Sequence, residues 1–227
     1  MRDEEQGPGV FAQGLLEDRS GIGGYRLVLR DRALLACAGL NTLLSAASFS
    51  QMNSALPAWA NGPVGLTPRI VGLAFLANTI VIGLAQLFVL RYLLPGRRRT
   101  RAVAAAAVLF GTAWLIILSA RNFHAQALAA GALIGGLSIF GLGETLLSPS
   151  LPALVNDLAE ESLRGRYNAV YSLSWQIGPI IGPVTAGFML SRGLGVTHFL
   201  GLALACALAA ALAVRIERVV PAEANRA

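Results

Sequence analysis

Long runs without a charged residue, separated by short polar segments, dominate the chain. These runs cover residues 33–68, 70–90, 102–120, 122–143, 145–156, 167–191 and 193–214. An α-helix rises about 1.5 Å per residue, so roughly 20 apolar residues cross the hydrocarbon core of a bilayer. Most of the runs reach that length, and they are apolar on all sides. The pattern therefore predicts an all-α membrane protein.

Helix-breaking residues divide the runs into six predicted transmembrane helices. The first run is too long for one straight helix, so we expect helix one to end near Leu56, before Pro57, and residues 57–69 to form a loop. Pro149 and Pro152 predict a bend near the end of helix four. The predicted helices cover residues 33–56, 70–92, 101–120, 125–148, 165–191 and 195–215, within one transmembrane domain at 33–216.

The arginines predict the orientation. All 18 basic residues are Arg, and with six helices 15 of them lie on the side that holds both termini. Cytoplasmic loops carry the excess of basic residues, so we expect both termini in the cytoplasm and the helices in the inner or plasma membrane. Residues 1–32 then form a cytoplasmic arm with a short interfacial helix at 25–32, and 217–227 form a cytoplasmic tail. The arginines expected in cytoplasmic loops include Arg97, Arg98, Arg99, Arg164 and Arg166.

Composition narrows the class further. Of the 227 residues, 55% are hydrophobic and 13% are charged, whereas a soluble domain has about 25% charged residues. A soluble globule and a disordered chain are therefore excluded. The net charge of +6 sits in short clusters between apolar runs, so we expect a lipid bilayer and not a nucleic acid as partner. No metal-ligand spacing, phosphate-binding loop or cluster of catalytic groups occurs, so we expect no metal, no cofactor and no enzyme activity.

Glu144 is the one acidic residue inside the apolar stretch from residue 122 to residue 156. An ionised carboxylate deep in a bilayer costs about 2.5–3.5 kcal/mol on insertion scales, so it usually faces a cavity or a partner. Glu144 is therefore a candidate for binding a proton or a cation. The alternative is a structural carboxylate that is paired or lies at the membrane interface.

Polar residues recur on one face of the first predicted helix. Asn41, Ser45 and Ser48 follow helical spacing, and Gln51 lies near the outer end. Such a face could line an aqueous path for substrate, or it could hold helices together by hydrogen bonds. The sequence leaves these two interpretations equal. His198 lies near the outer end of another span, where we expect a solvated side chain.

Two Gly-Pro pairs lie four residues apart in the fifth predicted helix. Gly178 and Gly182 would let a neighbouring helix approach closely, and Pro179 and Pro183 would bend the helix. The pair indicates either a helix that rocks against its neighbour or a static kink.

Several of these stretches together resemble the C-terminal six-helix half of a major facilitator superfamily transporter. The Arg164-Gly165-Arg166 loop is similar to the loop before the fifth helix of such a half. Residues 178–187 resemble the family's antiporter motif through Gly178, Gly182, Pro183 and Gly187. Residues 95–99 resemble a degenerate version of the family's loop between the second and third helices. The resemblance implies two inverted three-helix repeats, with the first and fourth helices lining the path.

The resemblance also implies the activity. We expect a secondary transporter that moves a small molecule by alternating access, through proton-coupled efflux. Its partner would be an N-terminal six-helix half in the same longer chain, or a second copy in a homodimer. The alternative is a non-transporting membrane interaction subunit or a truncated, degenerate transporter fragment.

Overall fold

The computed structural model describes residues 22–227, so most of the predicted arm at 1–32 lies outside the described residues. A short helix, α2 (Ile22–Val28), precedes the bundle, close to the interfacial helix expected at 25–32. The first long segment runs through α3 (Arg32–Leu44), the π-helical turn η1 (Ser45–Phe49), α4 (Ser50–Asn53) and α5 (Ala55–Asn61). We refer to these four pieces together as segment 32–61.

Five further long helices follow. They are α6 (Pro68–Phe88, continued by the π-helical turn η2, Val89–Leu93), α7 (Arg99–Ser119), α8 (Gln126–Leu158), α9 (Arg164–Ser191) and α10 (Gly195–Ile216). Single 3₁₀ turns, η3 (Ala120–Asn122) and η4 (Glu161–Leu163), follow α7 and precede α9. Five parts of the described chain are long and apolar enough to cross a membrane. They are segment 32–61, α6 with η2, α7 with η3, α8 and α10. The all-α multi-pass class is thus confirmed, while α9 as a sixth span stays a prediction.

Segment 32–61 begins and ends for local reasons. The Asp31 carboxylate accepts hydrogen bonds from the backbone N–H groups of Ala33 (2.8 Å) and Leu34 (3.3 Å) and so caps α3. The segment reaches Asn61, which corrects the expected end near residue 56. Pro57 does not stop it, because Pro57 lies in the first turn of α5, where a backbone N–H has no intrahelical acceptor.

Helix α8 is also longer than predicted. It continues to Leu158, ten residues past the expected end at 148, with Pro149 and Pro152 inside it. A proline in a helix costs about 3 kcal/mol. Here the continued turns bury Leu151, Leu154 and Val155, so packing of this apolar face holds the helix together.

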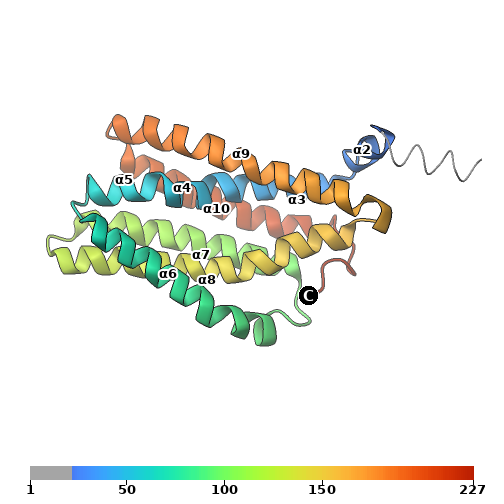
Figure 1. The fold of residues 1–227 in the computed structure, drawn as a ribbon, viewed down its shortest axis with the longest axis horizontal. Coiled ribbons are helices and arrows are strands. Elements are labelled where there is room, and N and C mark those ends of the chain that lie inside the picture. Colours follow the sequence, from blue (N-terminus) through green and yellow to red (C-terminus); the bar gives the residue numbers. More distant parts are fainter. Residues whose placement is uncertain (1–21) are drawn as a thin grey trace, which may run out of the picture.

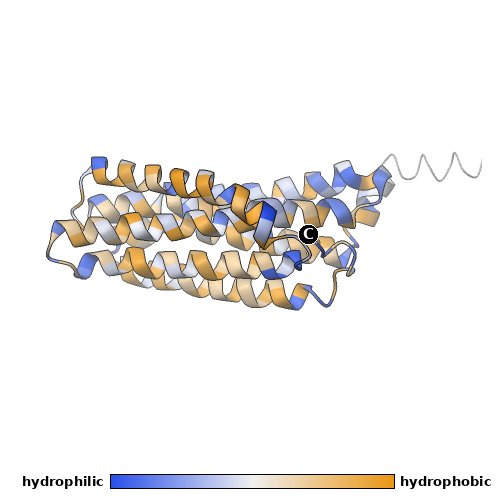
Figure 2. Cartoon of the chain, turned by 90° about the horizontal axis from the view of Figure 1, so that it is seen from below, coloured by the Kyte–Doolittle hydropathy of each residue, from blue (hydrophilic) through white to orange (hydrophobic). Residues whose placement is uncertain are grey.

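The long helices lie nearly side by side in one bundle (Figure 1). Neighbouring pairs follow the order α6–α8–α7–α10–α3–α9. Hydrophilic residues gather toward the ends of the bundle, and its middle is mainly hydrophobic (Figure 2). We call the end formed by the loops at 94–98 and 159–163 and by residues 217–227 the arginine-rich end.

Aromatic side chains fill the centre of the bundle. Phe110, Trp114, Phe140 and Phe199 are fully buried. Phe140 stacks on Phe110 with ring centroids 4.4 Å apart, and Trp114 contacts both Phe140 and Phe199. The Trp114 indole N–H donates to the Ala47 carbonyl at 2.9 Å. This core joins α7, α8 and α10 to segment 32–61.

Candidate transport path

The polar residues of the first predicted helix turn toward α9. The Asn41 amide donates to the Ser174 hydroxyl (2.8 Å) and to the Tyr171 carbonyl (3.1 Å). The Ser45 hydroxyl donates to the Trp175 carbonyl at 2.7 Å. Asn41 and Ser45 are fully buried, so both side chains lie at a helix interface and not on an open face.

The other two residues of that face point toward α10. The Ser48 hydroxyl lies 3.6 Å from the Cys206 thiol. The Gln51 carbonyl oxygen lies 3.0 Å from His198 Nε2, and its amide reaches the Thr185 hydroxyl at 3.3 Å. His198 is only 6% exposed, which corrects the expectation of a solvated histidine. The geometry therefore fits the helix-bonding interpretation of this face.

In the two Gly-Pro pairs of α9, the glycines face segment 32–61 and the prolines are exposed. A Cβ on Gly178 would lie 2.6 Å from the backbone carbonyl carbon of Ser45, and one on Gly182 would lie 2.5 Å from Ser50 Cβ. The two helices can pack this closely only because these side chains are absent. Gly187 has nothing within 4 Å of an added Cβ, so it takes no part in this contact.

Pro179 removes one helical hydrogen bond of α9, and Ser45 compensates for it. A proline lacks the N–H that would bond the carbonyl four residues earlier, here that of Trp175. That carbonyl accepts the hydrogen bond from Ser45. Both Pro179 and Pro183 lie inside a helix that continues from Arg164 to Ser191. The hydrogen bond satisfies a polar group that would otherwise face an apolar surrounding.

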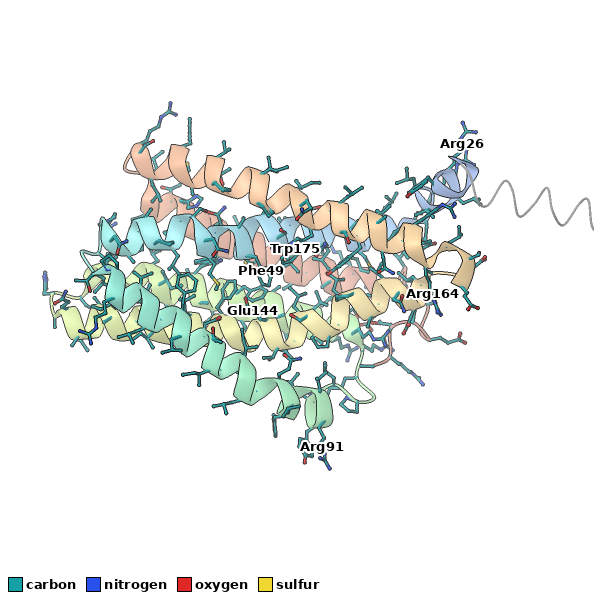
Figure 3. The ribbon with its side chains drawn as sticks, viewed as in Figure 1. Arg26, Phe49, Arg91, Glu144, Arg164 and Trp175 are labelled. Atoms are coloured by element: carbon teal, nitrogen blue, oxygen red, sulfur yellow. The ribbon has the colours of Figure 1, made fainter. Side chains whose placement is uncertain are left out.

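Glu144 lies on α8, near the middle of the long axis of the bundle (Figure 3). It is half-buried, and the side chain of Asn78 on α6 lies near its carboxylate. The Asn78 amide also donates to the Leu137 carbonyl at 3.1 Å. The glycines on either side fix its direction: a Cβ on Gly141 would lie 3.0 Å from Asn78, and one on Gly143 would lie 2.6 Å from Phe110. Glu144 therefore lies on the face of α8 between α6 and segment 32–61.

An aromatic cluster that the sequence did not predict includes Phe140, which lies on α8 before this carboxylate. Phe49, in the π-helical turn η1, contacts Trp175 on α9 (centroids 4.7 Å apart) and Phe140 on α8 (5.7 Å). Phe140 lies one helical turn before Glu144, so the two side chains share a face of α8. Phe49, Trp175 and Glu144 are seen together at mid-bundle in Figure 3. The sequence signal is slight: π-helical turns often mark functional positions, but the sequence does not predict where they form.

A cavity of about 280 Å³ opens between segment 32–61 and α9, next to this cluster. It is lined by Phe49, Ser50, Asn53, Ser54, Trp175, Pro179 and Pro183. Aromatic and hydroxyl side chains of this kind can hold a small amphipathic organic molecule. Within residues 22–227, no group of three His, Cys, Asp or Glu side chains could hold a metal ion.

The loop arginines lie at the arginine-rich end, where several are paired. Arg99 contacts Asp157 at 2.6 Å. Arg98 forms an ion pair with Glu217. Arg166 lies over the Tyr25 ring, 5.5 Å from its centroid, and Arg164 is exposed at the same end (Figure 3). These contacts join the loops and the C-terminal residues to one another.

A family model described as Major Facilitator Superfamily matches residues 38–227 of the chain. A quinate permease of Neurospora africana is 27% identical over 102 residues, which are 45% of this chain and 17% of that protein. An uncharacterized MFS-type transporter of Bacillus subtilis, YhjO, is 30% identical over 118 residues, 52% of this chain and 29% of the relative.

A probable quinate permease of Aspergillus fumigatus is 42% identical over a shorter region of 52 residues, 23% of this chain and 10% of the relative. The matched regions thus cover less than a third of each of these relatives. No solved structure matches the chain.

Proposed function

The chain belongs to the major facilitator superfamily, and we propose that it forms one six-helix half of a secondary transporter that moves a small molecule by alternating access. The observation that carries this proposal is a carboxylate, Glu144, at mid-bundle on α8, one helical turn from Phe140, which contacts Phe49. Carboxylates in spanning helices usually mark ion or substrate pathways. We favour transport over enzyme activity, because family membership and the site both point that way.

The sixth span of this proposal is α9. It is 28 residues long and uncharged from Tyr167 to Ser191, which is enough to cross a bilayer. Crossing by α9 would bring both ends of the described chain to the arginine-rich end, in the cytoplasm by the positive-inside rule.

The packing order supports two inverted three-helix repeats. In the proposed division, segment 32–61, α6 and α7 form the first repeat, and α8, α9 and α10 form the second. The second helix of each repeat packs on the first helix of the other, as α6 does on α8 and α9 does on α3, while the third helices α7 and α10 pack together. This exchange is what a pseudo-two-fold axis in the membrane plane would produce.

A second half is proposed as the partner, either another part of the same longer chain or a second copy. Large apolar side chains stand out from both flanking helices of the face that carries Glu144. They are Leu76, Ile80, Leu84 and Leu87 on α6, and Leu173, Ile177, Ile180 and Val184 on α9. A facing half would cover part of this surface and enclose the path.

The proposed ligand of this half is a proton or a cation, bound at Glu144. The described spans place a carboxylate at mid-bundle, whereas the arginines lie at the ends of the helices. Two relatives are named as quinate permeases. If this protein moved such an organic acid, cationic groups would have to come from the facing half. Proton-coupled efflux is the direction we propose.

The alternative function is a non-transporting interaction subunit or a degenerate transporter. Asn41, Ser45 and Gln51 form hydrogen bonds between helices. This bonding favours the alternative function, because residues that hold helices together do not line a path. The alternative function predicts that replacing Glu144 by a neutral residue leaves transport unchanged.

The test replaces Glu144 by Gln in the protein assembled with its second half in proteoliposomes. Flux of ethidium, a cationic probe, and of quinate, an anionic one, is measured with and without an imposed pH gradient. We expect Glu144→Gln to remove the response of flux to the gradient, because the amide cannot bind a proton. Glu144→Asp should retain part of it. Glu161→Gln, at an exposed loop carboxylate, should behave as the parent protein. Unchanged pH-dependent flux in Glu144→Gln would exclude this role.

A further inference from the structure

The largest of the cavities in the described part of the chain lies toward the arginine-rich end. Its volume is about 510 Å³. Its lining comes from η2, the loop before α7, the start of α7 and α8. The end of α6 turns away from α8 before this loop (Figure 1). The lining residues are Leu93, Leu94, Gly96, Arg97, Arg98, Arg101, Ala102, Ala105 and Leu146.

Three guanidinium groups surround the mouth of this cavity, and one carboxylate partly neutralises them. Glu217 pairs with Arg98 and, at 3.2 Å, with Arg101. Within the described part of the chain, the Arg97 side chain makes no ion pair. The rim therefore keeps a net positive charge and can attract an anion.

The inner wall of the cavity is apolar and continues along a helix. Leu93, Leu94 and Leu146 form its floor. From Arg101 and Ala105, the outward side of α7 continues through Val108, which is 55% exposed, and Leu115, which is 48% exposed. These positions follow one helical face. The site thus has a cationic mouth at the end of the bundle and an apolar track toward its middle.

We propose that this cavity binds an anionic phospholipid. Its phosphate would lie among Arg97, Arg98 and Arg101, and an acyl chain would lie along the outward side of α7. Basic pockets at the end of spanning helices attract anionic headgroups, and the apolar track explains why a lipid fits better than a free anion. Lipid binding at this site would not depend on what the protein transports.

Glu217 would compete with the lipid for Arg98 and Arg101. Removing a charge on the rim should therefore weaken lipid binding if the charge is an arginine and strengthen lipid binding if it is Glu217. Each basic residue at a membrane surface changes the binding of anionic lipid by about fivefold. Replacing Arg97 by Gln should weaken binding by about that factor, because one cation is lost. Replacing Glu217 by Gln should strengthen it by a similar factor, because two arginines lose their internal partner.

Native mass spectrometry of the full-length protein in detergent measures this binding. Phosphatidylglycerol is titrated against phosphatidylcholine, with Arg218→Gln as control, since Arg218 is exposed at the same end but does not line the cavity. We expect preferential binding of phosphatidylglycerol, weaker in Arg97→Gln, stronger in Glu217→Gln and unchanged in Arg218→Gln. Thermal unfolding of each variant without lipid checks that the fold is intact.

Three results would overturn the proposal. The first is equal binding of the two lipids by the parent protein. The second is an equal loss in Arg97→Gln and Arg218→Gln, which would show only a diffuse surface charge. The third is displacement of the lipid by inorganic phosphate at the same concentration, which would show a simple anion site without a role for the apolar track.

Discussion

The role of a polar side chain in a spanning helix depends on the groups that lie opposite it. Asn41, Ser45 and Gln51 share a face that could have lined water, but α9 and α10 place a carbonyl, a hydroxyl and an imidazole against them. Inside a bilayer such bonds replace those that water would supply. Glu144 differs, because it stays half-buried while Gly141 and Gly143 beside it pack against Asn78 and Phe110.

Gly178 offers a test at this scale. Replacing it by Ala would force a Cβ against the Ser45 backbone and push α9 away from segment 32–61. We expect a loss of about 1–3 kcal/mol, typical of overpacked contacts, read as a lower midpoint of thermal unfolding in detergent. Gly187→Ala is the matched control, since its Cβ would meet open space. Equal midpoints for the two variants would show that the close contact does not matter for stability.

At the scale of elements, the sequence predicted the long helices well and their ends less well. Charge-free runs identify spans because burying a charge in lipid is costly. Proline was a poor guide to the ends, because its cost depends on position. Pro57 lies in a first turn, and Pro149 and Pro152 are retained in α8 by packing. The sequence also did not predict that residues 217–227 pack against the loop before α7.

That contact centres on Asn225, which is 3% exposed. Its side chain accepts a hydrogen bond from the Thr100 backbone N–H (2.9 Å) and donates to the Thr100 hydroxyl (3.0 Å). Asn225→Ala leaves these groups buried without partners, so we expect a loss of about 1–2 kcal/mol. Hydrogen exchange of residues 96–100 should rise in this variant. Exchange as slow as in the parent protein would mean that the contact does not form in solution.

At the scale of the whole molecule, the face that carries Glu144, Phe49 and Trp175 is one wall of a proposed path. The carboxylate could be picked out from the sequence, because a charge within an apolar run is rare. The two aromatic residues could not, because their meeting depends on the π-helical turn and on the approach of α9. In the proposed transporter, another half would supply the facing wall.

Alternating access predicts that the two ends of this wall meet water in turn. Ser148 lies one turn from Glu144 toward the arginine-rich end, and Asn53 lies on segment 32–61 toward the other end; both are exposed. Single cysteines at these positions can be labelled with a membrane-impermeant thiol reagent, because the native Cys37 and Cys206 are buried. Leu204→Cys, on the outward side of α10 and 72% exposed, is the lipid-facing control.

The most direct test of the account is therefore the labelling of Ser148→Cys and Asn53→Cys in the assembled transporter, with and without a pH gradient. We predict that the gradient raises the labelling rate at one position and lowers it at the other, while Leu204→Cys stays unlabelled. Labelling at both positions as slow as at Leu204→Cys, whatever the gradient, would show that this face meets lipid or protein and not a transport path.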